Sequence, residues 1–317
     1  MQRIVRVVIG VAVALVALYF VGGGIITTLL LRELLTPGAI DWSRSNNPDP
    51  PKDPLELNYR GDPKTAFGYD FQIITYTTAL GGAEAWLVPA SSPSPVWAIY
   101  VHGIGGLREN GYKQLSVLHE AGIPTLLITY RNDKGAPSSP NHLYSFGLTE
   151  WQDVDDAVAW MLSNGAQRVV LVAESMGGAI AGEFLINSKR ADKVVGLALD
   201  APALDFNAIV LDKLEKRHLP FAQALASLGI LGIELLNGTD LGKADTRAAV
   251  ETYPGPLFLA QGTTDELVPA SIAEGVVAKR SAPTIYLETG ANHLLSFKEN
   301  PAKYREDFLA MLKLIAP

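Results

Sequence analysis

The order of apolar and polar positions divides the chain into a long apolar start and a remainder of short apolar runs. Residues 7–31 contain no charged side chain. A helix of these 25 residues would rise about 37 Å, enough to cross a hydrocarbon core of roughly 30 Å with some tilt. Arg3 and Arg6 precede the run, whereas the two charges that follow it cancel. The positive-inside tendency therefore predicts a single-pass transmembrane anchor over residues 1–35, with a cytoplasmic N-terminus and the rest of the chain outside the cytoplasm.

This apolar run has two competing interpretations. A cleaved signal peptide normally has a shorter apolar region followed by a small-residue site such as Ala-x-Ala, which this sequence lacks. The glycines of residues 22–24 are the weak point of the helix and leave cleavage open. A buried core helix conflicts with the length of the run. We therefore favour an uncleaved anchor.

Residues 36–67 follow the anchor and are rich in proline and polar side chains. This composition is typical of an extended segment between a membrane and a folded domain. We expect residues 36–67 to be a linker and residues 68–317 to be the folded domain.

Short apolar runs alternate with helical spacing from residue 68 onward. The runs expected to be strands are residues 72–78, 83–89, 96–101, 125–130, 169–172, 194–200, 256–261 and 284–288. Helical spacing is found near residues 110–121, 150–163, 178–186, 270–279 and 301–315. Two glycines between the first two runs predict a hairpin. The alternation predicts an α/β fold, a mostly parallel twisted sheet with helices on both faces.

The alternation breaks over about residues 203–253. This segment has a helical pattern and is strongly apolar around residues 221–236. It is expected to be an insert above the strand ends, either a satellite core of packed helices or a lid over a pocket. An apolar underside of such a lid would favour substrates with hydrocarbon parts.

The composition narrows the classes of protein. The chain has 317 residues, 48% hydrophobic content and a net charge of −7. The hydrophobic content allows a sizeable core, and the negative net charge argues against nucleic-acid binding, which calls for a basic face. It has no cysteine, which excludes disulfides, thiolate chemistry and cysteine-ligated zinc. We expect no nucleic-acid partner, no metal and no cofactor.

One serine stands between a predicted buried strand and a predicted helix. Ala173-Glu174-Ser175-Met176-Gly177 directly follows the strand of residues 169–172. This strand–turn–helix context is what a nucleophile elbow requires, with small residues two before and two after the serine. The pattern is weak alone, because a serine in an ordinary loop also fits it.

A serine nucleophile needs a base and a third group that orients the base. Because catalytic groups collect at the carboxyl ends of parallel strands, the residues that directly follow strands are the candidates. His293 follows the last predicted strand, and Asp265 follows the one before it. We therefore predict His293 as the base and Asp265 as the acid. Asp200, which also ends a strand, and Glu266 are the rival carboxylates.

A glycine-rich loop follows the predicted strand of residues 96–101. Its glycines let the backbone approach a ligand closely. The N–H groups of Ile104 and Met176 are the predicted oxyanion donors. A phosphate cradle would need a Gly-x-Gly-x-x-Gly run or a Gly-Lys-Ser/Thr ending, and neither is present. The residues expected to shape the loop and the elbow are His102, Gly103, Gly105, Gly106 and Gly177.

These motifs, in this order over residues 68–317, resemble those of the α/β-hydrolase superfamily. Tyr130-Arg131-Asn132-Asp133 and residues 147–153 are also similar to segments of membrane-anchored bacterial members and of the monoglyceride-lipase-like and prolyl-oligopeptidase-like branches. The resemblance implies Ser175 as nucleophile, Asp265 as acid and His293 as base. Ala173 replaces the usual glycine of the elbow and is small enough to keep the turn. Arg131 is interpreted as structural support below the site.

The sequence therefore predicts a serine hydrolase that cleaves acyl esters through an acyl-enzyme intermediate. The expected partners are a small acyl-ester or lipid-like substrate and a membrane. Two alternatives are a serine peptidase on the same machinery and a non-enzymatic, membrane-tethered binding module.

Overall fold

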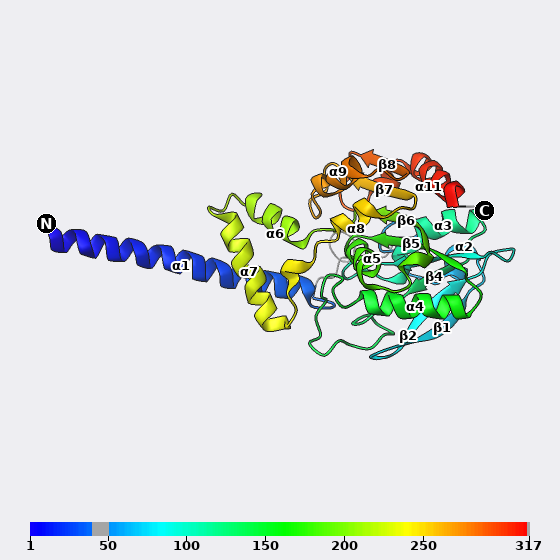
Figure 1. Cartoon of the computed structure of the whole chain (residues 1–317), viewed down its shortest axis with the longest axis horizontal. Coiled ribbons are helices and arrows are strands. Elements are labelled where there is room, and N and C mark those ends of the chain that lie inside the picture. The colour runs from blue at the N-terminus through cyan, green and yellow to red at the C-terminus, as the bar shows by residue number, and fades with distance from the viewer. Residues whose placement is uncertain (40–50, 316–317) are drawn as a thin grey trace.

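The computed structural model describes residues 1–39 and 51–315. In Figure 1, a body built round one sheet carries a long helix, α1 (Gln2–Leu35), that points away from it. Within the described residues, α1 is the helix long and apolar enough to cross a membrane. Part of the predicted linker, residues 40–50, lies outside the described residues.

One sheet of eight strands, in the order β1-β2-β4-β3-β5-β6-β7-β8, forms the centre of the described body. Its first two strands make the predicted hairpin, β2 pairs antiparallel with β4, and the remaining neighbours are parallel. The strands are β1 (Gln72–Thr78), β2 (Gly81–Val88), β3 (Val96–Val101), β4 (Thr125–Ile128), β5 (Arg168–Glu174), β6 (Val194–Asp200), β7 (Leu257–Gly262) and β8 (Thr284–Thr289). The prediction of a mostly parallel α/β sheet is confirmed.

Helices cover both faces of the sheet, as the alternating pattern predicted. Helices α4 (Trp151–Ser163), α5 (Met176–Asn187) and α9 (Ala270–Lys279) contribute to one hydrophobic core. Helices α3 (Tyr112–Glu120) and α11 (Pro301–Ile315) contribute to the other. The shorter elements are α2 (Pro63–Phe67), η1 (Arg108–Gly111), η2 (Ala191–Lys193) and α10 (Ser296–Glu299).

The central strand β5 shows why the apolar run forms a buried strand. Val169 and Leu171 point into one core, while Val170 and Val172 point into the other. Because both faces of β5 are buried, each position from Val169 to Ala173 is apolar, which is typical of a parallel sheet. The strand ends beside Ser175, so its position fixes the position of the serine.

Four helical segments lie between β6 and β7. They are α6 (Phe206–Glu215), α7 (Ala222–Asn237), η3 (Leu241–Lys243) and α8 (Arg247–Thr252). In Figure 1, α6 and α7 extend from the body beside the final turns of α1. Whether this insert acts as a lid stays a prediction.

The segments before the sheet contact the body closely. Leu35, at the end of α1, is fully buried, and its carbonyl accepts a hydrogen bond from the Tyr144 N–H. Tyr59 is also buried, and the Gly61 carbonyl accepts a hydrogen bond from the Tyr112 hydroxyl. The expected division of the chain at residues 35 and 67 stays a prediction, but these contacts join the described parts on either side of both boundaries.

Candidate active site

Ser175 occupies a strained turn between β5 and α5. Its backbone has φ 50° and ψ −122°, a conformation that costs a residue with a side chain on the order of 1–3 kcal/mol. Hydrogen bonds hold this turn in place. The Ser175 N–H donates to the Asp200 carbonyl at 3.0 Å, and the Ser175 carbonyl accepts from the N–H groups of Gly178 and Ala203, both at 2.9 Å. The turn directs the serine side chain beyond the carboxyl end of the sheet, as a nucleophile elbow does.

The small residues of the elbow are required by close backbone contacts. A Cβ atom at Gly177 would overlap the carbonyl oxygen of Val101 at the end of the neighbouring strand, β3. A Cβ atom at Gly178 would lie 2.6 Å from the Cβ atom of Pro202. Ala173 is buried within β5 without disturbing the pairing of β5 with β3 and β6.

The overlap at Gly177 gives a direct stability test. We expect Gly177→Ala to lower the free energy of unfolding by about 1–3 kcal/mol, because backbone atoms must move to admit a methyl group. Gly275→Ala is the matched control: Gly275 is also helical, and a Cβ atom there meets nothing within 4 Å. The control should be neutral or more stable, since alanine favours helix. Urea denaturation of both variants measures the difference, and equal stability would contradict the predicted overlap.

The structure brings the predicted base to the serine. His293 lies in the loop after β8, and its Nε2 atom is 3.0 Å from Ser175 Oγ. Its Nδ1 atom is 2.7 Å from Asp265 Oδ2. When Nδ1 donates its proton to this carboxylate, Nε2 is free to accept the hydrogen bond of the serine hydroxyl. The three side chains, far apart in sequence, therefore form one chain of hydrogen bonds.

Asp265 is fixed and buried at the other end of this chain. Its Oδ1 atom accepts hydrogen bonds from the N–H groups of Leu267 and Val268, both at 2.8 Å. Burial alone would raise the pKa of Asp265, but the hydrogen bond and charge of His293 and these two N–H groups outweigh burial, so the pKa is lowered. Asp265 is therefore an ionised carboxylate at neutral pH and can stabilise a protonated imidazole.

The two rival carboxylates lie elsewhere. Asp200 is fully buried beneath the elbow, where its Oδ2 atom is 2.8 Å from Lys113 Nζ and 3.1 Å from the Tyr304 hydroxyl. Burial raises the pKa of Asp200, and the charge of Lys113 opposes that rise. Glu266 is exposed, and its N–H donates to Asn292 Oδ1. The structure thus places Asp265, and neither rival, against His293.

The glycine-rich loop after β3 lies directly against the serine. A Cβ atom at Gly103 would stand 2.8 Å from Ser175 Cβ, so only glycine permits this approach. Gly105 has a φ of 64°, which also favours glycine, and a Cβ atom at Gly106 would stand 3.0 Å from the Gly103 carbonyl oxygen. Ile104 lies between these glycines and is half-buried. Met176 begins α5, so its N–H is one of the helix-start donors without an acceptor inside the helix.

His102 fixes this loop from below. The ring is fully buried, with Nε2 2.8 Å from Asp133 Oδ2 and Nδ1 2.9 Å from the Gly103 carbonyl oxygen. The Tyr130 hydroxyl donates to the His102 carbonyl at 3.0 Å. Burial lowers the pKa of His102, but the charge of Asp133 and the hydrogen bonds to the ring outweigh burial and raise it. The two ring nitrogens of His102 therefore bond to Gly103 and Asp133, and the imidazole that contacts the serine hydroxyl is that of His293.

Sequence reasoning did not assign roles to three residues of this neighbourhood. Asp133 and Tyr130 belong to a segment that resembles the superfamily, which was the available signal. Lys113 gave no signal, because a lysine in a helix is usually solvent-exposed. Arg131 binds Asp153 through Nε and Nη2, each at 2.8 Å, which fits its interpretation as structural support.

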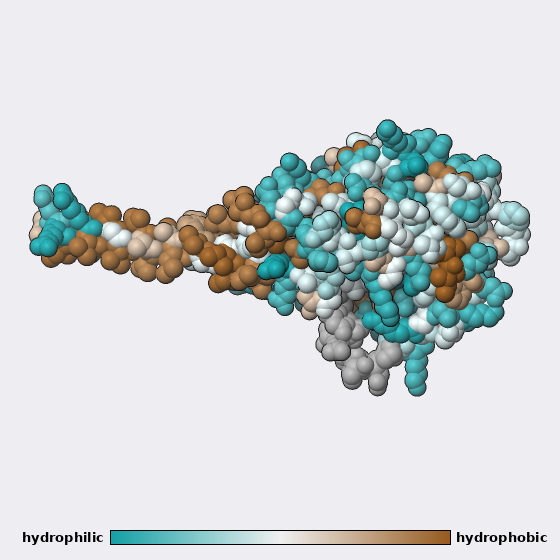
Figure 2. Space-filling model, turned by 90° about the horizontal axis from the view of Figure 1, so that it is seen from below, coloured by the Kyte–Doolittle hydropathy of each residue, from teal (hydrophilic) through white to brown (hydrophobic). Residues whose placement is uncertain are grey.

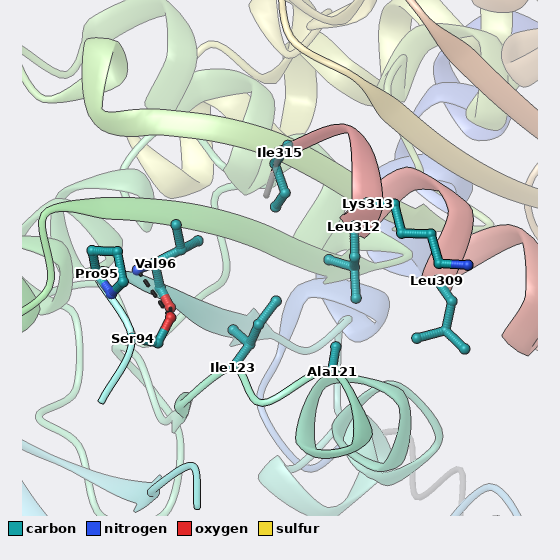
Figure 3. Close-up of a pocket in the computed structure, with 9 residues that line it drawn as sticks. All are labelled: Ser94, Pro95, Val96, Ala121, Ile123, Leu309, Leu312, Lys313 and Ile315. Atoms are coloured by element: carbon teal, nitrogen blue, oxygen red, sulfur yellow. Dashed lines mark hydrogen bonds between the residues drawn. The ribbon is translucent and has the colours of Figure 1, made fainter. Parts of the chain in front are cut away.

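A cavity of about 290 Å³ lies at the opposite edge of the sheet, where β3 begins. Figure 3 shows that aliphatic side chains from β3, α11 and the loop before β4 surround it. The residues that line it are Ser94, Pro95, Val96, Ala121, Ile123, Leu309, Leu312, Lys313 and Ile315. This cavity lies away from the Ser175 edge and shares no residue with the predicted site.

The fold and the site geometry agree with a comparison of the sequence against protein families. The model described as "Alpha/beta hydrolase family" matches residues 98–307, a range that includes Ser175, Asp265 and His293. The chain belongs to the alpha/beta hydrolase family.

Individual relatives are more distant. An uncharacterized protein of Mycobacterium tuberculosis is 27% identical over 214 residues, which cover 66% of this chain and 65% of the relative. The chain therefore spans slightly less than two thirds of the length of the curated relatives it matches. A Pyrococcus furiosus esterase has a similar structure, with a TM-score of 0.62 and 16% identity over 84% of this chain and 98% of that one. An esterase from Exiguobacterium antarcticum gives a TM-score of 0.55 and 17% identity over 76% and 100%.

Proposed function

We propose that this protein is a serine hydrolase that cleaves carboxylic esters. The observation that supports this most directly is the hydrogen-bonded chain from Ser175 through His293 to Asp265, on an elbow strained in the way that nucleophile elbows are. A weak nucleophile becomes effective when a base accepts its proton and a third group orients the base. The chain of contacts supplies each of these parts.

The proposed reaction follows from these contacts. His293 Nε2 takes the hydroxyl proton as Ser175 Oγ attacks the ester carbonyl carbon. The carbonyl oxygen becomes an oxyanion, which the N–H groups of Ile104 and Met176 stabilise. His293 then gives its proton to the departing alcohol oxygen, and an acyl-enzyme remains on Ser175. Water, activated by the same imidazole, attacks that ester and releases the acid.

An acyl or lipid-like ester is the proposed class of substrate. The insert between β6 and β7 is strongly apolar, which suits a hydrocarbon chain. Two structurally similar proteins carry the name esterase, which supports ester cleavage over other reactions of the fold. We further propose that α1 spans a membrane, with the hydrolase body outside the cytoplasm, because its apolar length fits a bilayer and Arg3 and Arg6 precede it.

A chain-length series tests the proposed reaction. Full-length protein in detergent is assayed on p-nitrophenyl esters of increasing acyl length and on aminoacyl p-nitroanilides. We expect kcat/KM for the best ester to exceed that for every amide by more than about tenfold, a discrimination of about 1.4 kcal/mol. Faster amide cleavage would favour the serine peptidase. No cleavage of either class would favour the membrane-tethered binding module.

A further inference from the structure

Helix α7 of the insert packs against α1 through small side chains on both helices. Thr27 stands against Gly229, and Thr28 stands against Gly232, so closely that neither glycine could carry a Cβ atom without a clash. The Thr28 hydroxyl lies 3.3 Å from the Gly229 carbonyl oxygen. Small residues and hydroxyl bonds of this kind join helices in a membrane, where apolar burial between helices supplies no driving force.

The contact continues to the start of α7. The Tyr19 hydroxyl donates to the Pro220 carbonyl at 2.5 Å, and the rings of Phe20 and Phe221 have centroids 5.6 Å apart. Figure 1 shows α7 lying across α1 near the point where α1 meets the body. Helix α7 therefore has a fixed orientation relative to α1.

One side of α7 is buried against other parts of the insert, α6 and η3. Ala226, Ile230 and Ile233 belong to the hydrophobic core on the α5 side of the sheet. At about 100° per residue, the opposite side of the helix carries Leu228, Leu231 and Leu235. We call these three residues the leucine stripe.

The leucine stripe is exposed, although Leu228 at its edge also lies against Gly24 of α1. Its side chains are 38%, 50% and 80% exposed, in chain order. Because α7 packs on α1 and, on its buried side, on α6 and η3, most of the stripe faces away from these helices. Figure 2 shows the hydrophobic surface of α1 continuing onto the adjoining helices of the insert. An exposed apolar surface that continues over neighbouring helices is typical of an interaction site.

The length of α1 places this surface at the edge of a bilayer. The first 20 apolar positions of α1, residues 7–26, rise about 30 Å, which matches the hydrocarbon core. Helix α7 contacts α1 from Tyr19 to Thr28, so this contact covers the last part of that core and its boundary. Lys216 and Arg217, exposed in the turn before α7, limit its depth because charged groups stay with the lipid headgroups.

We propose that α7 is an interfacial helix whose leucine stripe inserts among the acyl chains of the leaflet facing the hydrolase body. This inference rests on the proposed membrane span of α1, and it is independent of which bond the enzyme cleaves. The polar side chains Gln223 and Ser227 are exposed on another side of α7 and face water. Such a helix, apolar on one side and polar on another, lies in the plane of the interface.

The insertion connects the lipid surface to the candidate active site. The insert leaves β6 directly beside the elbow, where the Ala203 N–H donates to the Ser175 carbonyl. Helix α7 belongs to the same insert. A lipid-bound α7 would hold the Ser175 edge of the sheet close to the membrane surface.

The absence of cysteine makes the test direct, because a single cysteine introduced by substitution is the only labelled site. Leu231→Cys, Leu235→Cys and the matched control Ser227→Cys are labelled with an environment-sensitive NBD dye in the full chain. Val13→Cys reports on α1 itself. The labelled proteins are reconstituted in phosphatidylcholine–phosphatidylglycerol vesicles containing doxyl lipids. Each position is also titrated with iodide, a water-soluble quencher.

We expect the labels at residues 231 and 235 to be quenched severalfold more by shallow doxyl lipids, and severalfold less by iodide, than the label at residue 227. The label at residue 13 should respond most to deep doxyl lipids. If the labels at 231 and 235 behave like that at 227 while residue 13 is lipid-quenched, the interfacial helix is wrong and the anchor stands. If iodide also quenches the label at residue 13, the proposed membrane span is wrong, and the proposed interfacial helix is wrong as well.

Discussion

Replacing the candidate nucleophile should abolish nearly all ester hydrolysis while leaving the fold intact. We expect Ser175→Ala to lower kcat by about 10⁴–10⁶-fold, because His293 then has no hydroxyl to activate and no acyl-enzyme can form. In the native protein the Ser175 Oγ atom bonds to His293, whereas the backbone N–H and carbonyl of residue 175 hold the turn. The substitution therefore removes the first contact and keeps the others. Steady-state kinetics on the best p-nitrophenyl ester measures the loss. Unchanged circular dichroism and melting temperature show that the turn has survived.

Ser163→Ala is the matched control for this substitution. The Ser163 hydroxyl bonds to the Ala159 carbonyl at the exposed end of α4, far from the candidate site. Its removal should leave kcat unchanged within about twofold, since surface substitutions rarely exceed ±0.5 kcal/mol. Retention of more than about a tenth of the activity by Ser175→Ala, a loss below 1.4 kcal/mol, would contradict the proposed role.

Removing the buried lysine beneath the elbow should destabilise the whole body. Lys113 Nζ lies 2.9 Å from Glu174 Oε1 and 2.8 Å from Asp200 Oδ2, and all three side chains are at most 5% exposed. It also donates to the carbonyl of Leu294, next to His293. Lys113→Met leaves two carboxylates buried without a cation. We expect the free energy of unfolding at pH 7 to fall by about 3–5 kcal/mol.

The pH dependence of that loss has a definite sign. Burial already raises the pKa of Asp200, and removal of Lys113 removes the charge that opposes this rise. A folded-state pKa above the unfolded value gives stability that is present at low pH and is lost as the pH rises. The loss of unfolding free energy in Lys113→Met, relative to the native protein, should therefore become smaller from pH 7 toward pH 5.

Urea denaturation at several pH values measures this deficit. Lys298→Met is the control, because Lys298 is 67% exposed and pairs with Glu56 at 3.1 Å. An exposed pair of this kind contributes about 0–1 kcal/mol. A Lys113→Met variant that is no less stable than the control, or whose deficit grows on acidification, would contradict the assigned role of the buried lysine.

Much of the candidate site could be predicted from the sequence because of the strands that precede it. The runs that become β5, β7 and β8 are largely apolar and end abruptly in polar or small residues. In a parallel sheet such ends share one edge, so Ser175, Asp265 and His293 could be placed together before any coordinates were known. The glycines of the two motifs also indicated close backbone contacts, and the structure has no room for a side chain at Gly103 or Gly177.

Other features could not be predicted, because they depend on contacts between segments far apart in the chain. A lysine in an amphipathic helix normally reaches water, and the burial of Lys113 is explained only by the convergence of Glu174 and Asp200 beneath the elbow. The apolar pattern of α7 fits packing against the body as well as packing against lipid. Only the structure shows that its glycines meet Thr27 and Thr28 of α1, and that the leucine stripe remains exposed.

The most direct test of the central claim is covalent capture of the nucleophile. Full-length native protein and the Ser175→Ala variant are treated with a fluorophosphonate, digested, and analysed by mass spectrometry for the modified peptide. Activation of Ser175 by His293 and Asp265 predicts a phosphonylated Ser175 in the native protein and no adduct in the variant. Equal modification of both proteins, or an adduct on a different residue of the native protein, would contradict the account.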